Sequence, residues 1–317
     1  MTAPQIAAAG PAVPSRLVRA GDVLAFEWTK LRSVRSNYVT LIIAAMATIG
    51  STALVAHAVA SAPTPPQSGP VTALSLSFLG YAEYAVIPVS VLAVLQFTSE
   101  YTTGLISTTF CAVPRRRAVL TGKAAVTGGA ALVAGEVLGF ASFFLTQAML
   151  SGRHRGVSLA QPGVPGAVLA GGFVLCACAL TALSLGAIIR HTPGAIAVTL
   201  AAIYGLAALC LVLPSPWKDD LGRLTMPFAA AQVVATHPQP GLLSPGLSML
   251  VLVGWPAAAL LALGLFTPST GFILDTLAHE MIHLRQHLTN DREHHGPRFR
   301  RMRARVCAIH GFDPKTF

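Results

Sequence analysis

The chain has 317 residues, a formal net charge of +10, 53% hydrophobic residues and only 11% charged residues. Because charged residues make up about a quarter of a typical soluble domain, this composition excludes an ordinary soluble enzyme for most of the chain. It indicates an integral membrane protein. Residues 1–20 are rich in Ala and Pro, and we expect them to be disordered.

Residues 21–37 precede the first apolar run and mix aromatic and aliphatic side chains with basic ones, among them Trp28, Lys30 and Arg32. This mixture predicts a helix that lies in the lipid headgroup layer, with its Trp and basic residues at the interface. An ordinary amphipathic linker would have the same pattern.

Six apolar runs then follow, each close to the 20 residues that an α-helix needs to cross about 30 Å of hydrocarbon. The predicted fold is therefore all-α: a polytopic membrane protein with six transmembrane helices, followed by a short cytoplasmic helical tail. The spans are expected at residues 39–60, 73–97, 124–150, 164–189, 194–213 and 247–265.

Lys and Arg are distributed unequally between the two sides of this arrangement. Ten lie on the side of the N-terminus, in residues 16–35, in residues 115–123 and at Arg190, against four on the other side. The excess predicts that the N-terminus, and after six spans the C-terminus, lie in the cytoplasm, with the protein in the cell membrane. It also explains most of the positive charge, so nucleic acid is not an expected partner.

Two carboxylates, Glu83 and Glu136, fall within the second and third predicted spans. An ionised group at membrane depth is costly, so each should face protein or water. Two interpretations are open for both: a transport path or coupling contact, or a residue that packs helices or lies near the interface.

The connection between the second and third spans, residues 98–123, carries an apolar stripe that ends before Pro114 and three arginines. Such a stripe predicts a short helix on the cytoplasmic face of the membrane. It consists of Leu105, Ile106, Phe110 and Val113.

Two phrases, EWTKLRS (residues 27–33) and SEYTTGLISTT…VPRRR…K (residues 99–123), resemble the permease subunits of type-2 ABC exporters, most closely the actinobacterial kind. The resemblance covers about residues 18–266 and implies a permease domain at 21–266, a separate ATP-binding cassette subunit, and a second permease subunit in a homo- or heterodimer. The chain lacks a Gly-x-x-x-x-Gly-Lys-Ser/Thr phosphate loop, so ATP enters only through that partner. The resemblance implies that the residues coupled to the ATPase are Glu100, Tyr101, Gly104, Arg115, Arg116 and Arg117.

Residues 267–317 differ from the rest because they hold six of the ten histidines and many charges. Apolar residues at helical spacing predict a helix over 275–288, on which His279 and His283 share one face and can bind one Zn²⁺. Glu280 beside them is the natural general base, and the His-Glu-x-x-His pattern is the zincin signature. From the residues alone, the third ligand is His287, His294, His295 or His310.

The phrase LAHEMIHLRQH…HHGPRFRRM…GFDP resembles the metal-binding half of SprT-like zinc metallopeptidases, over about residues 270–317. The resemblance implies His295 as the third ligand, with His294 as the alternative, and surface positions for His287 and His310. That family places a helix and a small antiparallel sheet ahead of the metal helix. Here the sixth span takes their place, so we expect an incomplete domain.

The main hypothesis is an exporter permease subunit with an appended zinc-binding tail, and no other cofactor is expected. The alternative is a membrane-anchored SprT-like zinc metallopeptidase. A composite of a permease and an unrelated gene end, joined near residues 264–268, is a third interpretation. For the tail arginines, contact with anionic lipid or solvent is favoured over nucleic acid. The exported substrate is not defined by the sequence.

Overall fold

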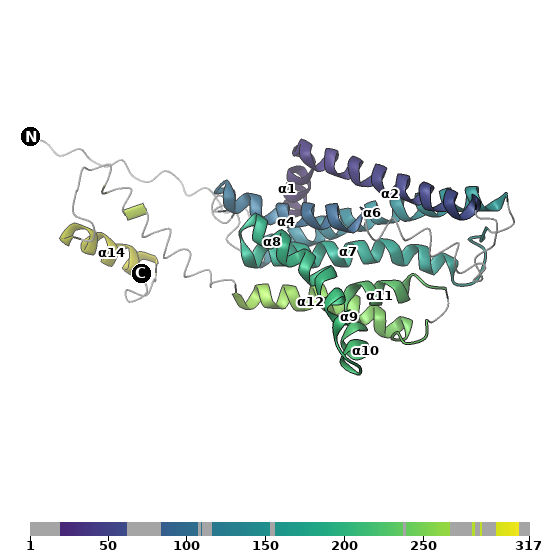
Figure 1. The fold of residues 1–317 in the computed structure, drawn as a ribbon. Helices are drawn as coiled ribbons and strands as arrows, with labels where there is room; N and C mark the ends of the chain where they lie inside the picture. Colours follow the sequence, from purple (N-terminus) through teal and green to yellow (C-terminus); the bar gives the residue numbers. More distant parts are fainter. Residues whose placement is uncertain are drawn as a thin grey trace, which may run out of the picture.

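The computed structural model describes residues 20–61, 84–106, 109, 116–152, 156–236, 239–266, 281–282, 286 and 296–310. All regular secondary structure in these ranges is helical, which confirms the predicted all-α class. The long helices run side by side along one direction, and the short α1 lies across their end (Figure 1).

The chain turns sharply between α1 (Ala20–Ser33) and α2 (Arg35–Ser61), with only Val34 outside a helix. Asn37 stabilises this corner: its side-chain Nδ2 donates to the Leu31 carbonyl at 3.0 Å, and its backbone N–H donates to the Val34 carbonyl at 3.1 Å. Most of the segment predicted at 21–37 is thus the separate helix α1, and its last residues, 35–37, already belong to α2.

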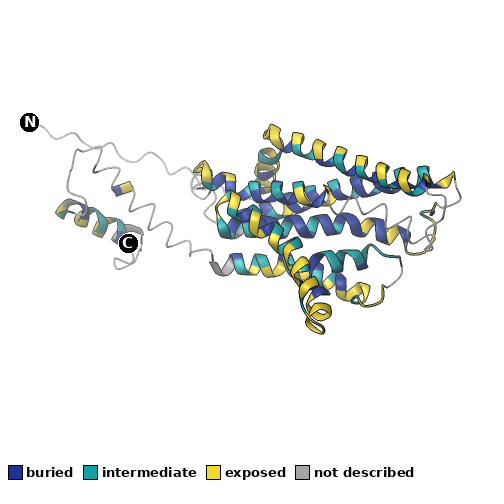
Figure 2. Ribbon diagram, in the orientation of Figure 1, coloured by how far each residue is buried: buried dark blue, intermediate teal, exposed yellow. Residues whose placement is uncertain are grey.

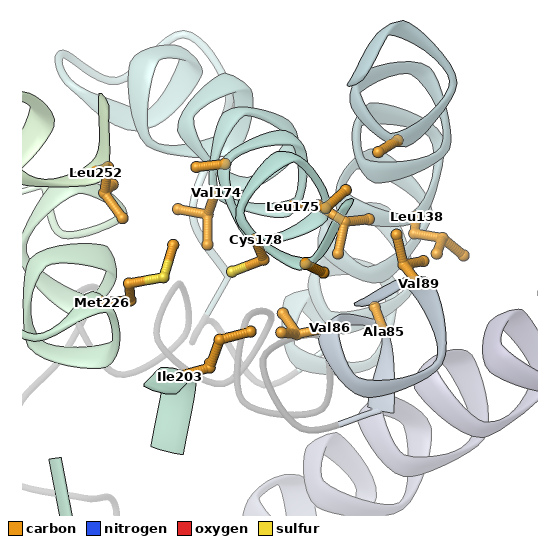
Figure 3. Close-up of a cluster of buried hydrophobic side chains, with 14 of the residues drawn as sticks. Ala85, Val86, Val89, Leu138, Val174, Leu175, Cys178, Ile203, Met226 and Leu252 are labelled. Carbon is orange, nitrogen blue, oxygen red and sulfur yellow. The ribbon is translucent and has the colours of Figure 1, made fainter. Parts of the chain in front are cut away.

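The centre of the bundle is α7 (Val164–Ile189), which packs against α4 (Val86–Thr102) and α6 (Arg116–Ser151). Figure 3 shows Val174, Leu175 and Cys178 of α7 between apolar residues of the neighbouring helices. Small residues permit this close approach. At Gly186 of α7, a Cβ atom would lie only 3.1 Å from the backbone oxygen of Val94 in α4.

The second half of the bundle contains one long helical rod and three further helices. The rod changes pitch at a π-helical turn, η1, and each of its two halves meets different neighbours: α8 packs on α4 and α7, and α9 packs on α10 and α11. These elements are α8 (Thr192–Leu200), η1 (Ala201–Gly205), α9 (Leu206–Val212), α10 (Trp217–Gly222), α11 (Met226–Val233) and α12 (Pro245–Phe266).

Among the described residues, five helices are long and apolar enough to cross a membrane, and each overlaps a predicted span. The second predicted span, 73–97, begins outside the described residues, and Glu83 also lies outside them. The span continues into α4, which is apolar but, with 17 residues, is shorter than the five candidate spans. The count of six therefore stays a prediction. The five helices are Arg35–Ser61, Ala118–Ser151, Val164–Ile189, Thr192–Val212 and Pro245–Leu263.

The outer surface of the bundle is apolar. Figure 2 shows α7 largely buried, whereas α2 and α12 expose much of their length. The exposed positions of α2 include Ile42, Ile43, Met46 and Leu54. Exposed apolar faces on helices of this length are unfavourable in water and match the hydrocarbon of a bilayer.

The Gly186 contact predicts that Gly186→Leu lowers the unfolding temperature of the detergent-solubilised protein, because overpacking costs about 1–3 kcal/mol. Gly254→Leu is the matched control, since a Cβ at Gly254 of α12 meets nothing within 4 Å. Thermal unfolding followed by circular dichroism measures both. Equal unfolding temperatures would contradict the close approach of α4 and α7.

Candidate functional site

Four charged side chains meet at one end of the bundle: Glu27 and Lys30 of α1, Glu100 of α4 and Lys123 of α6. Lys123 Nζ donates to Glu27 Oε2 at 2.7 Å, to Glu100 Oε1 at 2.6 Å and to the Gln96 carbonyl at 3.1 Å. Lys30 Nζ donates to Glu27 Oε1 at 3.0 Å and also pairs with Glu100. Two acids and two bases leave this ion cluster without net charge.

A glycine explains why α1 can reach α6. A Cβ atom at Gly122 would lie 2.6 Å from Val23 Cγ1, so the missing side chain lets Val23 pack directly onto α6. This contact brings Glu27, one turn further along α1, to Lys123, whose side chain is only 1% exposed. Lys123 Nζ also lies 5.5 Å from the ring centroid of Phe97.

The surroundings of Lys30 act on its pKa in opposite directions. Burial lowers the pKa, but the hydrogen bonds and charges of Glu100 and Glu27 outweigh burial and raise it above 10.5. Because the folded-state pKa is the higher one, the stabilisation from Lys30 is fully present below pH 10.5 and is lost only as the pH rises through the folded-state value. Lys30 therefore keeps its charge throughout the physiological range.

The structure places the predicted ATPase-coupling residues in different surroundings. Glu100 is 4% exposed and belongs to the ion cluster, so it positions the segment and offers little surface to a partner. Tyr101 stacks on Phe97, with ring centroids 6.0 Å apart, and lies 5.4 Å from the Arg190 guanidinium.

The rest of that segment begins where α4 ends. Gly104 has φ +72°, a left-handed conformation that glycine adopts without strain, and its N–H donates to the Tyr101 carbonyl at 3.3 Å. Arg116 and Arg117 begin α6. Arg115 lies outside the described residues, as do Phe110 and Val113 of the predicted stripe.

The sequence did not predict that Glu27, Lys30 and Lys123 would surround Glu100. The available signal was that all four charges flank apolar runs on the same side of the predicted membrane. Pairing residues that are 96 positions apart, as Glu27 and Lys123 are, requires the tertiary fold.

Glu136 lies in the middle of α6, with one carboxylate oxygen, Oε2, buried and without a hydrogen-bond partner among the residues that the structure describes. Its side chain lies across α7, where a Cβ at Gly172 would be 2.3 Å from Oε1. This contact favours the helix-packing interpretation, because the carboxylate fills the space that Gly172 leaves open.

The described part of the tail contains an amphipathic helix, α14 (Pro297–His310). Its buried and half-buried positions follow helical spacing, and the opposite face exposes Arg300, Arg301 and Arg305. The resulting helix has an apolar stripe and a basic face. The stripe consists of Phe299, Met302, Val306 and Cys307, with the half-buried Arg303 beside it.

Three described residues ahead of α14, at positions 281, 282 and 286, differ in their exposure. Ile282 and Gln286 are 4% and 3% exposed, whereas Met281 is 68% exposed. Residues four apart share one face of an α-helix, and residue 281 points about 100° away from residue 282, so these three exposures fit a helix with one buried face.

The predicted zinc residues, His279, Glu280, His283 and His295, and the alternative His294, lie outside the described residues. Within the part of the chain that the structure does describe, no three His, Cys, Asp or Glu side chains are grouped as a metal site. The donor set itself fits zinc, because imidazole nitrogens are ordinary Zn²⁺ ligands and a nearby carboxylate is the usual proton acceptor.

Comparison with known families supports the interpretation of the tail. Residues 265–316 match the SprT-like family, which is 52 of the 317 residues. No curated protein and no solved structure matches the chain. The resemblance of the tail to SprT-like proteins is confirmed, and the resemblance of residues 18–266 to exporter permeases has no support from these comparisons.

The ion cluster predicts a large effect for Lys123→Met, because this change leaves two buried carboxylates with only the half-buried Lys30 between them. Removing one partner of a buried ion pair costs about 3–5 kcal/mol, so the unfolding temperature in detergent should fall sharply. Lys218→Met, on the exposed surface of α10, is the control and should change little. Adding Glu27→Gln to Lys123→Met should restore part of the loss, and equal stability of the two single variants would contradict the cluster.

Proposed function

We propose that this protein is a membrane-anchored, SprT-like zinc protein, in which a bundle of apolar helices holds a metallopeptidase-like segment at the membrane surface. One observation carries the proposal: the SprT-like match begins at residue 265, and the apolar helix α12 ends at Phe266. The zinc-binding segment thus follows directly from a candidate membrane span. The excess of Lys and Arg on one side supports a cytoplasmic location for this segment.

His279, His283 and His295 are the proposed zinc ligands. Bound zinc would act as a Lewis acid toward a peptide carbonyl. Glu280, next to the first ligand in sequence, would accept a proton from the attacking water as the general base. The buried side chains of Ile282 and Gln286 would support the ligand-bearing face, because ligands need a packed environment to hold their orientation.

Zinc binding has more support than peptide hydrolysis. The described part of the tail is helical and presents no strand edge to which an extended peptide could add. A segment of 52 residues also buries a small core, so bound zinc would contribute to its folding.

A second candidate function, an exporter permease subunit, is favoured by the ion cluster. The cluster joins the two phrases on which that resemblance depends, because Glu27 and Lys30 belong to the first, and Glu100 and Lys123 to the second. In this function, the exposed residues after Glu100 and the arginines at 115–117 would contact an ATP-binding cassette subunit. A second permease subunit would complete the complex.

Zinc content of the purified full-length chain tests the main proposal. Wild type should carry about one Zn²⁺ per chain, and His279→Ala and His283→Ala should lose it, because each removes one of three protein ligands. His57→Ala is the control, since it removes an exposed imidazole from α2. Glu280→Gln should keep zinc but lower the rate of casein cleavage by about 10²–10⁴-fold.

Each result has a distinct meaning. Equal zinc in His279→Ala and His57→Ala would exclude the metal site. Zinc that depends on the histidines, without cleavage by the wild type, would leave a zinc-binding segment and exclude the peptidase.

The permease function predicts that the chain, co-expressed with an ATP-binding cassette subunit, co-purifies with it and raises its ATPase rate. Changing Arg115, Arg116 and Arg117 together to Glu should abolish both effects, because the contact depends on their positive charge. Arg223→Glu, at the end of α10, is the control. Unchanged co-purification of the triple variant would count against this function.

A further inference from the structure

A cavity of about 700 Å³ lies between α1, α2, α4 and α6. This volume is within the range of roughly 300–1,000 Å³ that ligand pockets occupy. Its walls are apolar and come from small or aliphatic side chains such as Leu92, Ala93 and Ala130. At Gly129, which also lines the cavity, an added Cβ would meet nothing within 4 Å, so α6 leaves this space open.

Most of the polar side chains that line the cavity come from α1 and the start of α2. They are Trp28 and Arg32 of α1 and Asn37 and Tyr38 of α2, and α4 and α6 add Gln96 and Thr127. Trp28 and Tyr38 are both exposed, and aromatic residues of this kind mark the level of the lipid headgroups. The cavity therefore has a polar mouth at the interface and an apolar interior alongside the spans.

Arg32 differs from the two lysines nearby. Lys30 and Lys123 are paired within the ion cluster, whereas Arg32 is exposed and forms no ion pair with any residue that the structure describes. Its planar guanidinium can donate two parallel hydrogen bonds to a phosphate. A cation at the mouth of an apolar cavity is complementary to an anionic amphiphile.

We propose that this cavity binds one acyl chain of an anionic phospholipid, with the phosphate of the headgroup on Arg32. Water is a poor occupant, because cavities lined by apolar side chains stay dry. The bilayer supplies the ligand directly, since α2 is a candidate span with an exposed apolar face. The bound lipid would join α1 and α2 to α4 and α6, and this role does not depend on the function of the tail.

Native mass spectrometry of the full-length protein, titrated with phosphatidylglycerol or with phosphatidylcholine of the same acyl chains, tests the proposal. Wild type should bind one phosphatidylglycerol in preference to phosphatidylcholine. Arg32→Gln should weaken phosphatidylglycerol binding by about fivefold, the effect of one basic residue at an anionic lipid surface. Its binding of phosphatidylcholine should change less, because the choline cation offsets the charge of the phosphate in that lipid.

A second variant tests the apolar part of the site. Ala130→Phe places a ring in the cavity and should abolish the binding of both lipids. Leu132→Phe is its control, because Leu132 lies on α6 outside the cavity lining and is exposed. Arg35→Gln is the control for Arg32→Gln, since Arg35 is exposed and does not line the cavity.

Three outcomes would overturn the proposal. Equal losses in Arg32→Gln and Arg35→Gln would mean general attraction to a charged surface. Full binding by Ala130→Phe, with a wild-type unfolding temperature, would place the lipid elsewhere. Equal binding of the two lipids by wild type would remove the role of the net negative charge of the lipid. Because Arg32 is at the surface, its variant tests the site even if Ala130→Phe does not fold.

Discussion

The neutral ion cluster of Glu27, Lys30, Glu100 and Lys123 is the constraint on which one end of the bundle depends. Charges removed from water need partners, and here each carboxylate is paired with both lysines. Helices from three separate parts of the chain therefore have to meet at one point. Once α1, α4 and α6 are joined there, α7 can pack between α4 and α6 along its length.

Away from the ion cluster, the helices that the structure describes are held together by close packing at small residues and not by ion pairs. Lipid chains are as apolar as leucine, so helices in a membrane gain stability from close contact. Gly186 and Gly172 allow that contact on two sides of α7, against the Val94 backbone and the Glu136 side chain. The bundle thus combines the ion cluster at one end with close helix packing in its middle. The segment that matches the SprT-like family follows the candidate span α12.

The sequence predicted the long elements well, because apolar runs of fixed length have few alternatives. The span at 164–189 agrees with α7 at both ends, and α12 begins two residues before the predicted 247. The helices α10 and α11 were not predicted, because short segments that contain proline and charged residues show no clear periodicity of hydrophobic residues. The partners of Glu100 were missed because contacts between distant residues leave no local pattern. In the tail, the spacing of His279 and His283 predicts a zinc site, which stays a prediction because both residues lie outside the described part of the chain, and spacing contains no information on the third ligand.

The π-helical turn at Ala201–Gly205 has a consequence for how this chain can change over evolution. A π turn closes with one residue more than an α turn, and such turns occur as single-turn bulges within α-helices. The rod uses that residue to present one side to α4 and α7 and another to α10 and α11. Deleting one residue there would rotate everything that follows by about 100°. Substitutions in this turn should thus be tolerated by descendants of this chain far more often than changes in its length.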